Sequence, residues 1–242
     1  MKEAKLYIGT SGWTYDHWKG VFYPETLSSR LWLEYYCRQF DAVELNASFY
    51  RIPKVAVVEG WNKRTPEGFC FAVKVSRLIS HMKRLKNCDH EMEWFFSTFK
   101  PLEPKIGVFL VQLPPSLKCD PCLIESFSSH LPPKIPFAFE FRNKSWYNDE
   151  TYDVLRKNHL AFCIHDMQGC PTDRTVTADT VYVRFHGCGA RYGGDYPEEV
   201  LADWAVWIRE QRNEAQRIFC FFNNDFQGFA VKNSLRLREL VG

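Results

Sequence analysis

Charged and polar side chains recur at the carboxyl ends of the apolar segments of this sequence. The clearest case is the segment 137–146, FAFEFRNKSW, in which three phenylalanines alternate with Ala138, Glu140 and Arg142. Because side chains alternate between the two faces of a strand, we expect the phenylalanines on one face and the ionic pair at the end of the other. Such a strand suits a barrel whose lower part is packed and whose mouth carries out chemistry.

The same pattern predicts a ring of polar residues at the mouth of one barrel. Its members each follow an apolar strand body, and they are Thr10, Glu44, Asn46, Lys74, Gln112, Glu140, Arg142, Asp166, Arg184, His186, Asn223 and Asp225. Catalytic groups of barrel enzymes come from the carboxyl ends of the strands. We therefore expect a catalytic set consisting of Glu140, Glu44, Lys74, His186 and Asp166. The remaining members of the ring, with Trp13 and Trp146, are the expected substrate-binding residues.

These residue types indicate acid–base chemistry on an anionic molecule. Arg142 and Arg184 are expected to hold a phosphate or carboxylate. The loop after the seventh strand, with Gly187 and Gly189, would let the backbone approach that anion closely. Either glutamate could be the general base, His186 the acid or orienting group, and Lys74 a Schiff-base amine if its pKa were depressed. The alternative is a structural network in which these ions pair only with one another.

The elements that must position these residues follow from hydrophobic periodicity. The expected strands are 6–8, 41–46, 69–74, 106–112, 137–141, 160–165, 181–185 and 218–222, and the expected helices are 25–40, 53–62, 88–99, 121–131, 150–158, 197–213 and 229–240. The link 168–179 is poor in apolar periodicity and is expected to lack a full helix. Because strands and helices alternate and the 242 residues are close to the ~250 of a (β/α)8 barrel, we expect one TIM-like domain over residues 1–242. The absence of a G-x-G-x-x-G motif after the first strand weakens the dinucleotide-binding alternative.

Composition narrows the class of protein. Hydrophobic residues make up 45% and charged residues 25%, and the net charge is +2, so no overall basic surface indicates a polyanionic partner. We find no apolar run long enough for a membrane span and expect a cytoplasmic protein. The nine cysteines are expected to be reduced, because Cys119 and Cys122 form a lone C-x-x-C without a second pair at zinc-site spacing.

Two surface features leave alternatives open. The aromatic segment 13–23 is either a lid packed on its own barrel or a stacking wall for a sugar or base. The basic run 77–86 is more simply a solvated face, although a nucleic-acid-binding module would use both features.

Six phrases carry a resemblance that covers the chain in order. They are IGTSGW (8–13), VELNASFYR (43–51), QLPP (112–115), EFRNKSW (140–146), VRFHG (183–187) and FFNND (221–225). The chain resembles the bacterial YecE-like family, the seventy-second domain-of-unknown-function family, which implies a TIM-barrel-like fold and no defined activity. That fold has been likened to endonuclease IV and to sugar isomerases, which bind metals through clustered His, Glu and Asp. Here Lys74, Arg142 and Arg184 stand at matching positions, which weakens the expectation of a metal.

The sequence therefore predicts an enzyme that acts on a small, anionic, sugar-like molecule, of a hydrolase, lyase or isomerase class that is not resolved. No cofactor is expected, and a divalent metal is the disfavoured alternative, as in an endonuclease-IV-like phosphodiesterase. The third alternative is a non-catalytic module that binds nucleic acid.

Overall fold

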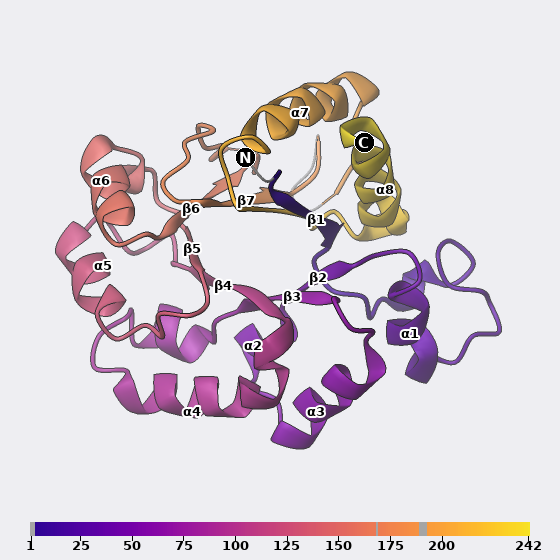
Figure 1. The fold of residues 1–242 in the computed structure, drawn as a ribbon, viewed down its shortest axis with the longest axis horizontal. Coiled ribbons are helices and arrows are strands. Elements are labelled where there is room, and N and C mark those ends of the chain that lie inside the picture. Colours follow the sequence, from indigo (N-terminus) through magenta and orange to yellow (C-terminus); the bar gives the residue numbers. More distant parts are fainter. Residues whose placement is uncertain (1–2, 168, 189–192) are drawn as a thin grey trace.

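The computed structural model describes residues 3–167, 169–188 and 193–242, and in this part of the chain eight parallel strands form a nearly closed barrel (Figure 1). The strands are β1 (Lys5–Thr10), β2 (Ala42–Leu45), β3 (Cys70–Lys74), β4 (Ile106–Gln112), β5 (Phe137–Glu140), β6 (Ala161–His165), β7 (Thr180–Phe185) and β8 (Arg217–Phe222). Their order in the sheet is β1-β8-β7-β6-β5-β4-β3-β2, with parallel pairing throughout. The predicted TIM-like barrel is confirmed.

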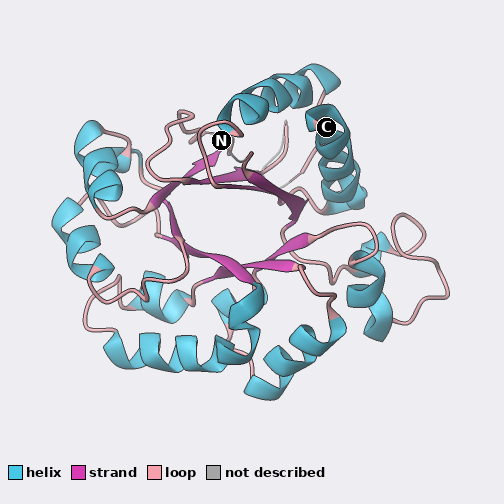
Figure 2. Ribbon diagram, viewed as in Figure 1, coloured by secondary structure: helices cyan, strands magenta, loops and turns pink. Residues whose placement is uncertain are grey.

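Helices surround the barrel on its outer side (Figure 2). They are α1 (Trp32–Tyr36), α2 (Ala47–Tyr50), α3 (Val55–Arg64), α4 (Asp89–Phe99), α5 (Pro121–Ser128), α6 (Asp149–Lys157), α7 (Glu198–Gln211) and α8 (Phe229–Val241). The described residues of the β6–β7 link, 169–179, contain no helix, as predicted.

The first helix is much shorter than the predicted span 25–40. A 3₁₀ turn occupies Ser29–Leu31, and α1 covers only five residues. Serine favours turns over helix interiors, which explains why regular helix does not extend through Ser28 and Ser29. Trp32, at the start of α1, packs against the preceding segment, because its ring stacks on that of Tyr23 with centroids 4.7 Å apart. The segment before α1 therefore packs as an aromatic loop. The short α2 was not predicted.

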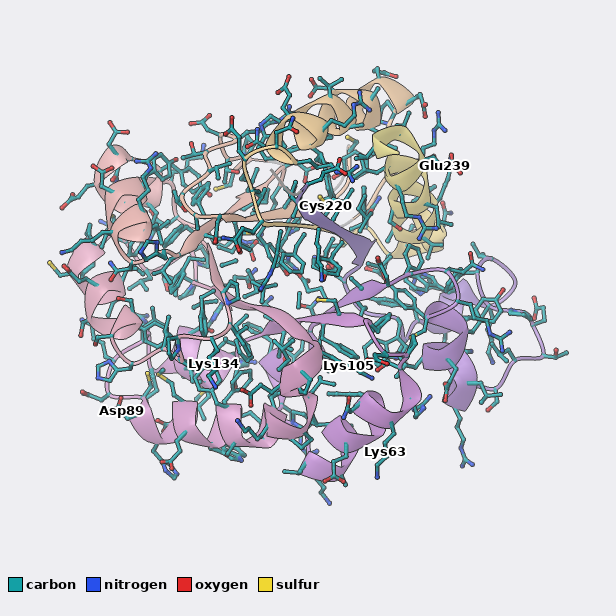
Figure 3. All side chains as sticks on the ribbon, in the orientation of Figure 1. Lys63, Asp89, Lys105, Lys134, Cys220 and Glu239 are labelled. Carbon is teal, nitrogen blue, oxygen red and sulfur yellow. The ribbon has the colours of Figure 1, made fainter. Side chains whose placement is uncertain are left out.

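Alternation along the strands separates two apolar clusters. The outward residues of the strands pack under the helices, and Phe139 on β5, for example, meets Phe127 of α5 with ring centroids 6.3 Å apart. The inward residues form a second cluster in which small side chains from β2, β3, β5 and β6 lie opposite Tyr182, Phe219 and Phe221. Side chains thus fill the interior that the ribbon alone leaves empty (Figure 3). The phase expected for the phenylalanines of β5 is confirmed.

The barrel closes at a seam between β1 and β2. These two strands are joined in register only by one bridge, between Ser11 and Glu44, among the described residues. Just below it, the Tyr36 hydroxyl accepts a 3.0 Å hydrogen bond from Thr10 N and donates one of 3.1 Å to Ala42 O. Gly9 allows the close approach, because a Cβ atom there would lie 2.3 Å from Ala42 O. The Tyr36 hydroxyl of α1 therefore connects the backbones of β1 and β2 through two hydrogen bonds.

All nine cysteines are free thiols. Between Cys119 and Cys122, Asp120 caps α5 by accepting a 3.2 Å hydrogen bond from Leu123 N. No helix among the described residues is long and apolar enough to cross a membrane.

Candidate functional site

Arg184 lies at the centre of an ion cluster at the carboxyl end of the strands. It follows Tyr182 on the inward face of β7 and is only 1% exposed. Its Nε and Nη2 atoms donate hydrogen bonds of 2.8 and 2.7 Å to the two carboxylate oxygens of Glu44. Its Nη1 atom donates a third, of 2.8 Å, to Glu140 Oε2. Burial alone would lower the pKa of Arg184, but Glu140 and Glu44 hold it well above its ordinary value, so the guanidinium stays charged.

Glu44 accepts hydrogen bonds from four side chains. Besides Arg184, its donors are Ser11 Oγ at 2.7 Å, Asn46 Nδ2 at 3.0 Å and the Tyr182 hydroxyl at 2.7 Å. Burial opposes ionisation of this carboxyl, but Arg184 outweighs it and the pKa of Glu44 is lowered. Glu44 is therefore an ionised carboxylate, and both of its oxygens accept hydrogen bonds.

Glu140 on β5 is the second buried carboxylate. Its Oε2 atom accepts a 2.6 Å hydrogen bond from Gln112 Nε2 as well as the bond from Arg184, and its Oε1 atom is ion-paired with Arg142 Nη2. Burial would raise the pKa of Glu140, but the two arginines hold it well below its ordinary value. Two cations and two carboxylates thus form one chain of ion pairs across the mouth, from Glu44 to Arg142.

Arg142 links this chain to the loop after β7. Its Nη2 atom lies 2.9 Å from His186 Nε2, and its Nη1 atom contacts Met167 Sδ. A guanidinium can only donate, so His186 Nε2 accepts. Burial and the charge of Arg184 hold the pKa of His186 well below its ordinary value, which makes a neutral imidazole the stable form.

Lys74 is the cation of the mouth that lies outside this chain of pairs. It ends β3, it is 7% exposed, and its Nζ atom lies 4.2 Å from the ring centroid of Phe49. No hydrogen bond or ion pair joins its amine to any described residue. Burial, with the charge of Arg184 next in importance, lowers the pKa of Lys74 from 10.5 to about 7. Its backbone is held firmly, because Ser48 Oγ donates a 2.5 Å hydrogen bond to Lys74 O.

His165 brings an imidazole that the sequence reasoning missed. Its side chain lies on the inward face of β6, together with those of Ala161 and Cys163. The sequence analysis had instead assigned Asp166, the next residue along, to the mouth. His165 Nε2 lies 3.2 Å from Phe141 O and 3.3 Å from the Tyr147 hydroxyl. Burial lowers the pKa of His165 to about 4, so it is neutral at pH 7. A neutral imidazole therefore lies on the β6 side of the mouth.

Comparison with known proteins places this geometry in a family. The pattern of the family described as "Protein of unknown function DUF72" matches residues 7–242, which is nearly the whole chain. The chain belongs to the DUF72 family. It is 30% identical to the UPF0759 protein YunF of Bacillus subtilis over 98% of this chain and 94% of that protein. It is also 35% identical to the UPF0759 protein YecE of Escherichia coli over 45% of this chain and 38% of that protein.

Solved structures of DUF72 proteins share the fold. A Thermotoga maritima family member superposes with a TM-score of 0.90 at 31% identity, covering 98% of this chain and 99% of that chain. An Enterococcus faecalis member gives 0.86 at 23% identity over 98% and 95%. A methyltransferase from Methanosarcina mazei, at 8% identity and a TM-score of 0.53 over 99% and 93%, shares the barrel architecture alone.

Three residues of this DUF72 chain that were predicted to line the mouth or to bind substrate make packing contacts. Thr10 faces outward, where its hydroxyl donates to Gly12 O at 2.6 Å, and its inward neighbour Ser11 takes the expected position. Trp146 is buried on the outer side of the barrel, where its ring stacks on that of Phe141 with centroids 4.6 Å apart. Trp13 packs edge-on against Trp61 at 6.0 Å. Thr10 and Trp146 therefore contribute packing, whereas Trp13 is only partly buried and its role in substrate binding stays a prediction.

Three more predicted residues lie at the rim or behind it. Asp166 accepts a 2.7 Å hydrogen bond from His186 N and is bonded to the Tyr196 hydroxyl, so it shapes the loop after β7. Asn223 and Asp225 follow β8, and the Asp225 carboxylate lies 3.5 Å from His17. The sequence analysis placed Asp166 at the mouth on the face of Phe162 and Ile164, which is the outward face of β6. Counting two residues on from the inward Cys163 would have selected His165.

Segment 13–23 is packed on its own barrel. Trp18 and Tyr23 are buried, with Trp18 Nε1 donating to Asp225 O at 2.9 Å and the Tyr23 hydroxyl donating to Trp13 O at 2.6 Å. The lid alternative therefore describes these two rings. In the basic run, Lys83 pairs with Glu91 at 3.1 Å.

Buried polar atoms without a partner among the described residues gather at the mouth. They include Asn46 Oδ1, Arg142 Nε and His165 Nδ1. Buried polar atoms are normally satisfied, so these three atoms are candidates to bind water or a ligand. Among the described residues, no group of three or more His, Cys, Asp or Glu side chains is arranged to hold a metal. Gly187 has a φ of +100°, whereas Gly189 lies outside the described residues.

Proposed function

We propose that this DUF72 protein is an enzyme that acts by acid–base chemistry on a small, anionic, sugar-like molecule bound at the mouth of the barrel. The observation that carries the proposal is Lys74, a residue that is only 7% exposed and whose amine makes no hydrogen bond to any described residue, next to an ion cluster at the strand ends. Burying a cation without a partner destabilises a fold, and such groups are concentrated at functional sites.

The arrangement supports a division of roles between the ions. Glu44 and Glu140 are ionised and already accept hydrogen bonds from Arg184, so neither can donate a proton near pH 7. Their low pKa values also make them weak bases. Lys74, with a pKa of about 7, exchanges a proton readily at neutral pH. The proposal therefore assigns proton transfer to Lys74 and assigns the positioning of the surrounding charges to the two glutamates.

The same bonds move the expected anion site away from Arg184. Three of the five N–H groups of that guanidinium donate to Glu44 and Glu140, and its Nη1 atom also lies 3.4 Å from His186 Nε2, which leaves little for a second anion. Arg142 Nε has no partner among the described residues, and protonated Lys74 has no ion pair there. An anionic group there would accept from Arg142 Nε and pair with the charge of Lys74. We therefore place the phosphate or carboxylate of the substrate between Arg142 and Lys74.

Ligand titration tests this assignment. Wild-type protein would be titrated with phosphorylated sugars and sugar acids while its melting temperature is followed, alongside Lys74→Met and Lys63→Met. Lys63 is an exposed lysine on α3, remote from the mouth, and serves as the matched control (Figure 3). We expect binding to weaken about tenfold or more in Lys74→Met, by the ~1.4 kcal/mol that a tenfold change represents, and to be unchanged in Lys63→Met. A ligand that binds both variants equally would contradict the assignment.

A further inference from the structure

The amine of Lys74 is arranged as a nucleophile. Its Cα is anchored at the end of β3, where Ser48 Oγ bonds to Lys74 O and Val75 N donates to Leu110 O at 2.9 Å. The side chain is nine-tenths buried, and Nζ lies over the ring of Phe49 and not against a carboxylate. The Glu44 and Glu140 carboxylates, which could have paired with the amine, bond instead to Arg184. The lone pair of the deprotonated amine is thus not engaged by a donor among the described residues.

We propose that Lys74 forms a Schiff base with an aldehyde or ketone that carries a carboxylate or phosphate group. This inference rests on the proposed function, because it names the substrate class and the covalent step of the same site. It goes beyond proton transfer, since it requires a carbonyl carbon within bonding distance of Nζ.

Two properties of the surroundings favour this step. A lysine must lose its proton before it attacks, and a pKa of about 7 leaves roughly half of the Lys74 amines neutral at pH 7. An ordinary lysine with a pKa of ~10.4 is neutral in fewer than ~1 in 1,000 molecules at that pH. Phe49 offers the face of its ring to Nζ at 4.2 Å, which stabilises a positive charge there, and the iminium product carries such a charge.

The step balances without an external oxidant or reductant. The Nζ lone pair of the neutral amine forms a bond to the carbonyl carbon, and the electrons of the C=O π bond move to oxygen. The nitrogen then loses a proton and the oxygen takes one up, which gives a neutral carbinolamine. The C–O bond then breaks, and the oxygen leaves as water after a second protonation while nitrogen forms a double bond to carbon. Overall, a protonated amine and a carbonyl compound give an iminium ion and one water. The iminium ion withdraws electrons from its neighbouring carbon, which weakens a C–H or C–C bond there.

Reductive trapping tests this inference. The protein would be incubated with pyruvate or glyceraldehyde 3-phosphate and sodium cyanoborohydride, and the modified lysines would be identified by peptide mass spectrometry. In the wild-type protein we expect Lys74 to be modified at least ~10-fold faster than Lys63 at pH 7.5, because far more of its amine is neutral. The rate at Lys74 should rise with pH around a midpoint near 7.

Variants and a second readout keep the inference separable from the proposed function. Lys74→Arg retains the positive charge but not the nucleophile, so it should keep anion binding and lose the rapid adduct. Lys63→Met should change neither. If neither probe modified Lys74 faster than Lys63, the Schiff-base inference would fail. Lys74-dependent binding of a non-carbonyl sugar acid in the same preparation would still support the proposed function.

Discussion

Ser11 and Glu44 meet at the seam where the barrel closes, and they meet twice. Their backbones form the bridge that joins β1 to β2, and Ser11 Oγ donates a 2.7 Å hydrogen bond to Glu44 Oε1. Glu44 in turn holds Arg184 on the opposite side of the mouth. The contact that closes the barrel is therefore also the first link in the chain of ions at the candidate site.

Gly9→Ala tests how tightly this seam is packed. The added Cβ would lie 2.3 Å from Ala42 O and 3.0 Å from the Tyr36 hydroxyl, so β1 and β2 would have to separate. We expect the free energy of unfolding to fall by ~1–3 kcal/mol, as for overpacked cores. The measurement is equilibrium unfolding in urea.

Gly60→Ala is the control, because a Cβ at that helical position meets nothing within 4 Å, and we expect it to stabilise the fold by ~0.5–1 kcal/mol. Equal effects from both substitutions would contradict the close contact at the seam.

Lys74→Met should change how stability depends on pH. The folded protein holds this amine with a pKa of about 7, against an ordinary value of 10.5, so between these pH values the unfolded chain binds the proton that the folded protein lacks. Stability rises with pH wherever the unfolded state binds more protons. Wild type should therefore gain ~2 kcal/mol relative to Lys74→Met between pH 7 and pH 9, at 1.36 kcal/mol per pKa unit. Below pH 7 the methionine variant should be the more stable protein.

Urea unfolding at pH 6.5, 8 and 9 measures this difference. Using the difference between two proteins cancels the contribution of the other titrating groups that they share. Lys63→Met should show no pH-dependent difference from wild type. A wild-type curve parallel to that of Lys74→Met would mean that Lys74 has no depressed pKa.

Strand phase decided which parts of the site the sequence could predict. On β5 the three phenylalanines mark the outer face, so Glu140 and Arg142 could be assigned inward from alternation alone. On β6 both faces are apolar, because Cys163 faces inward and Ile164 faces outward, and alternation gave no direction. The wrong phase selected Asp166 and missed His165.

The pairing of the ions could not be predicted from sequence for a different reason. Arg184 and its two carboxylate partners come from β7, β2 and β5, and their distances depend on the stagger of strands around the barrel. Alternation places a residue on a face but does not say which neighbour it reaches. The missed Tyr182 shows the same limit, since an inward tyrosine one layer below Arg184 bonds across the barrel to Glu44.

Glu44→Gln should destabilise the protein strongly. The amide keeps the shape but removes one of the two charges that compensate the buried guanidinium of Arg184. Breaking a buried ion pair from one side costs ~3–5 kcal/mol, whereas replacing both partners costs less. We therefore expect Glu44→Gln combined with Arg184→Met to be more stable than Glu44→Gln alone. Thermal and urea unfolding of the two variants measure this, and a double variant less stable than the single one would show that the pair is not the reason for the loss.

Glu140→Gln should also destabilise the protein, and the loss should depend on acid. The amide oxygen can still accept from Gln112 or Arg184, but Arg142 and Arg184 each lose a buried charge partner, so the expected loss at pH 7 is ~3–5 kcal/mol, as for Glu44→Gln. Because the pKa of Glu140 lies well below its ordinary value of 4.5, its ionised form stabilises the wild type above that pH. This stabilisation is lost as the pH falls through the folded pKa. The difference between wild type and variant should therefore narrow below pH 4.5, as measured by urea unfolding at pH 7, 5 and 3.

A ligand found in the sugar panel should bind the variant more weakly, because Arg142 loses the carboxylate that orients it. Unchanged affinity would remove Glu140 from the site, and a constant difference down to pH 3 would show that its carboxylate carries no depressed pKa.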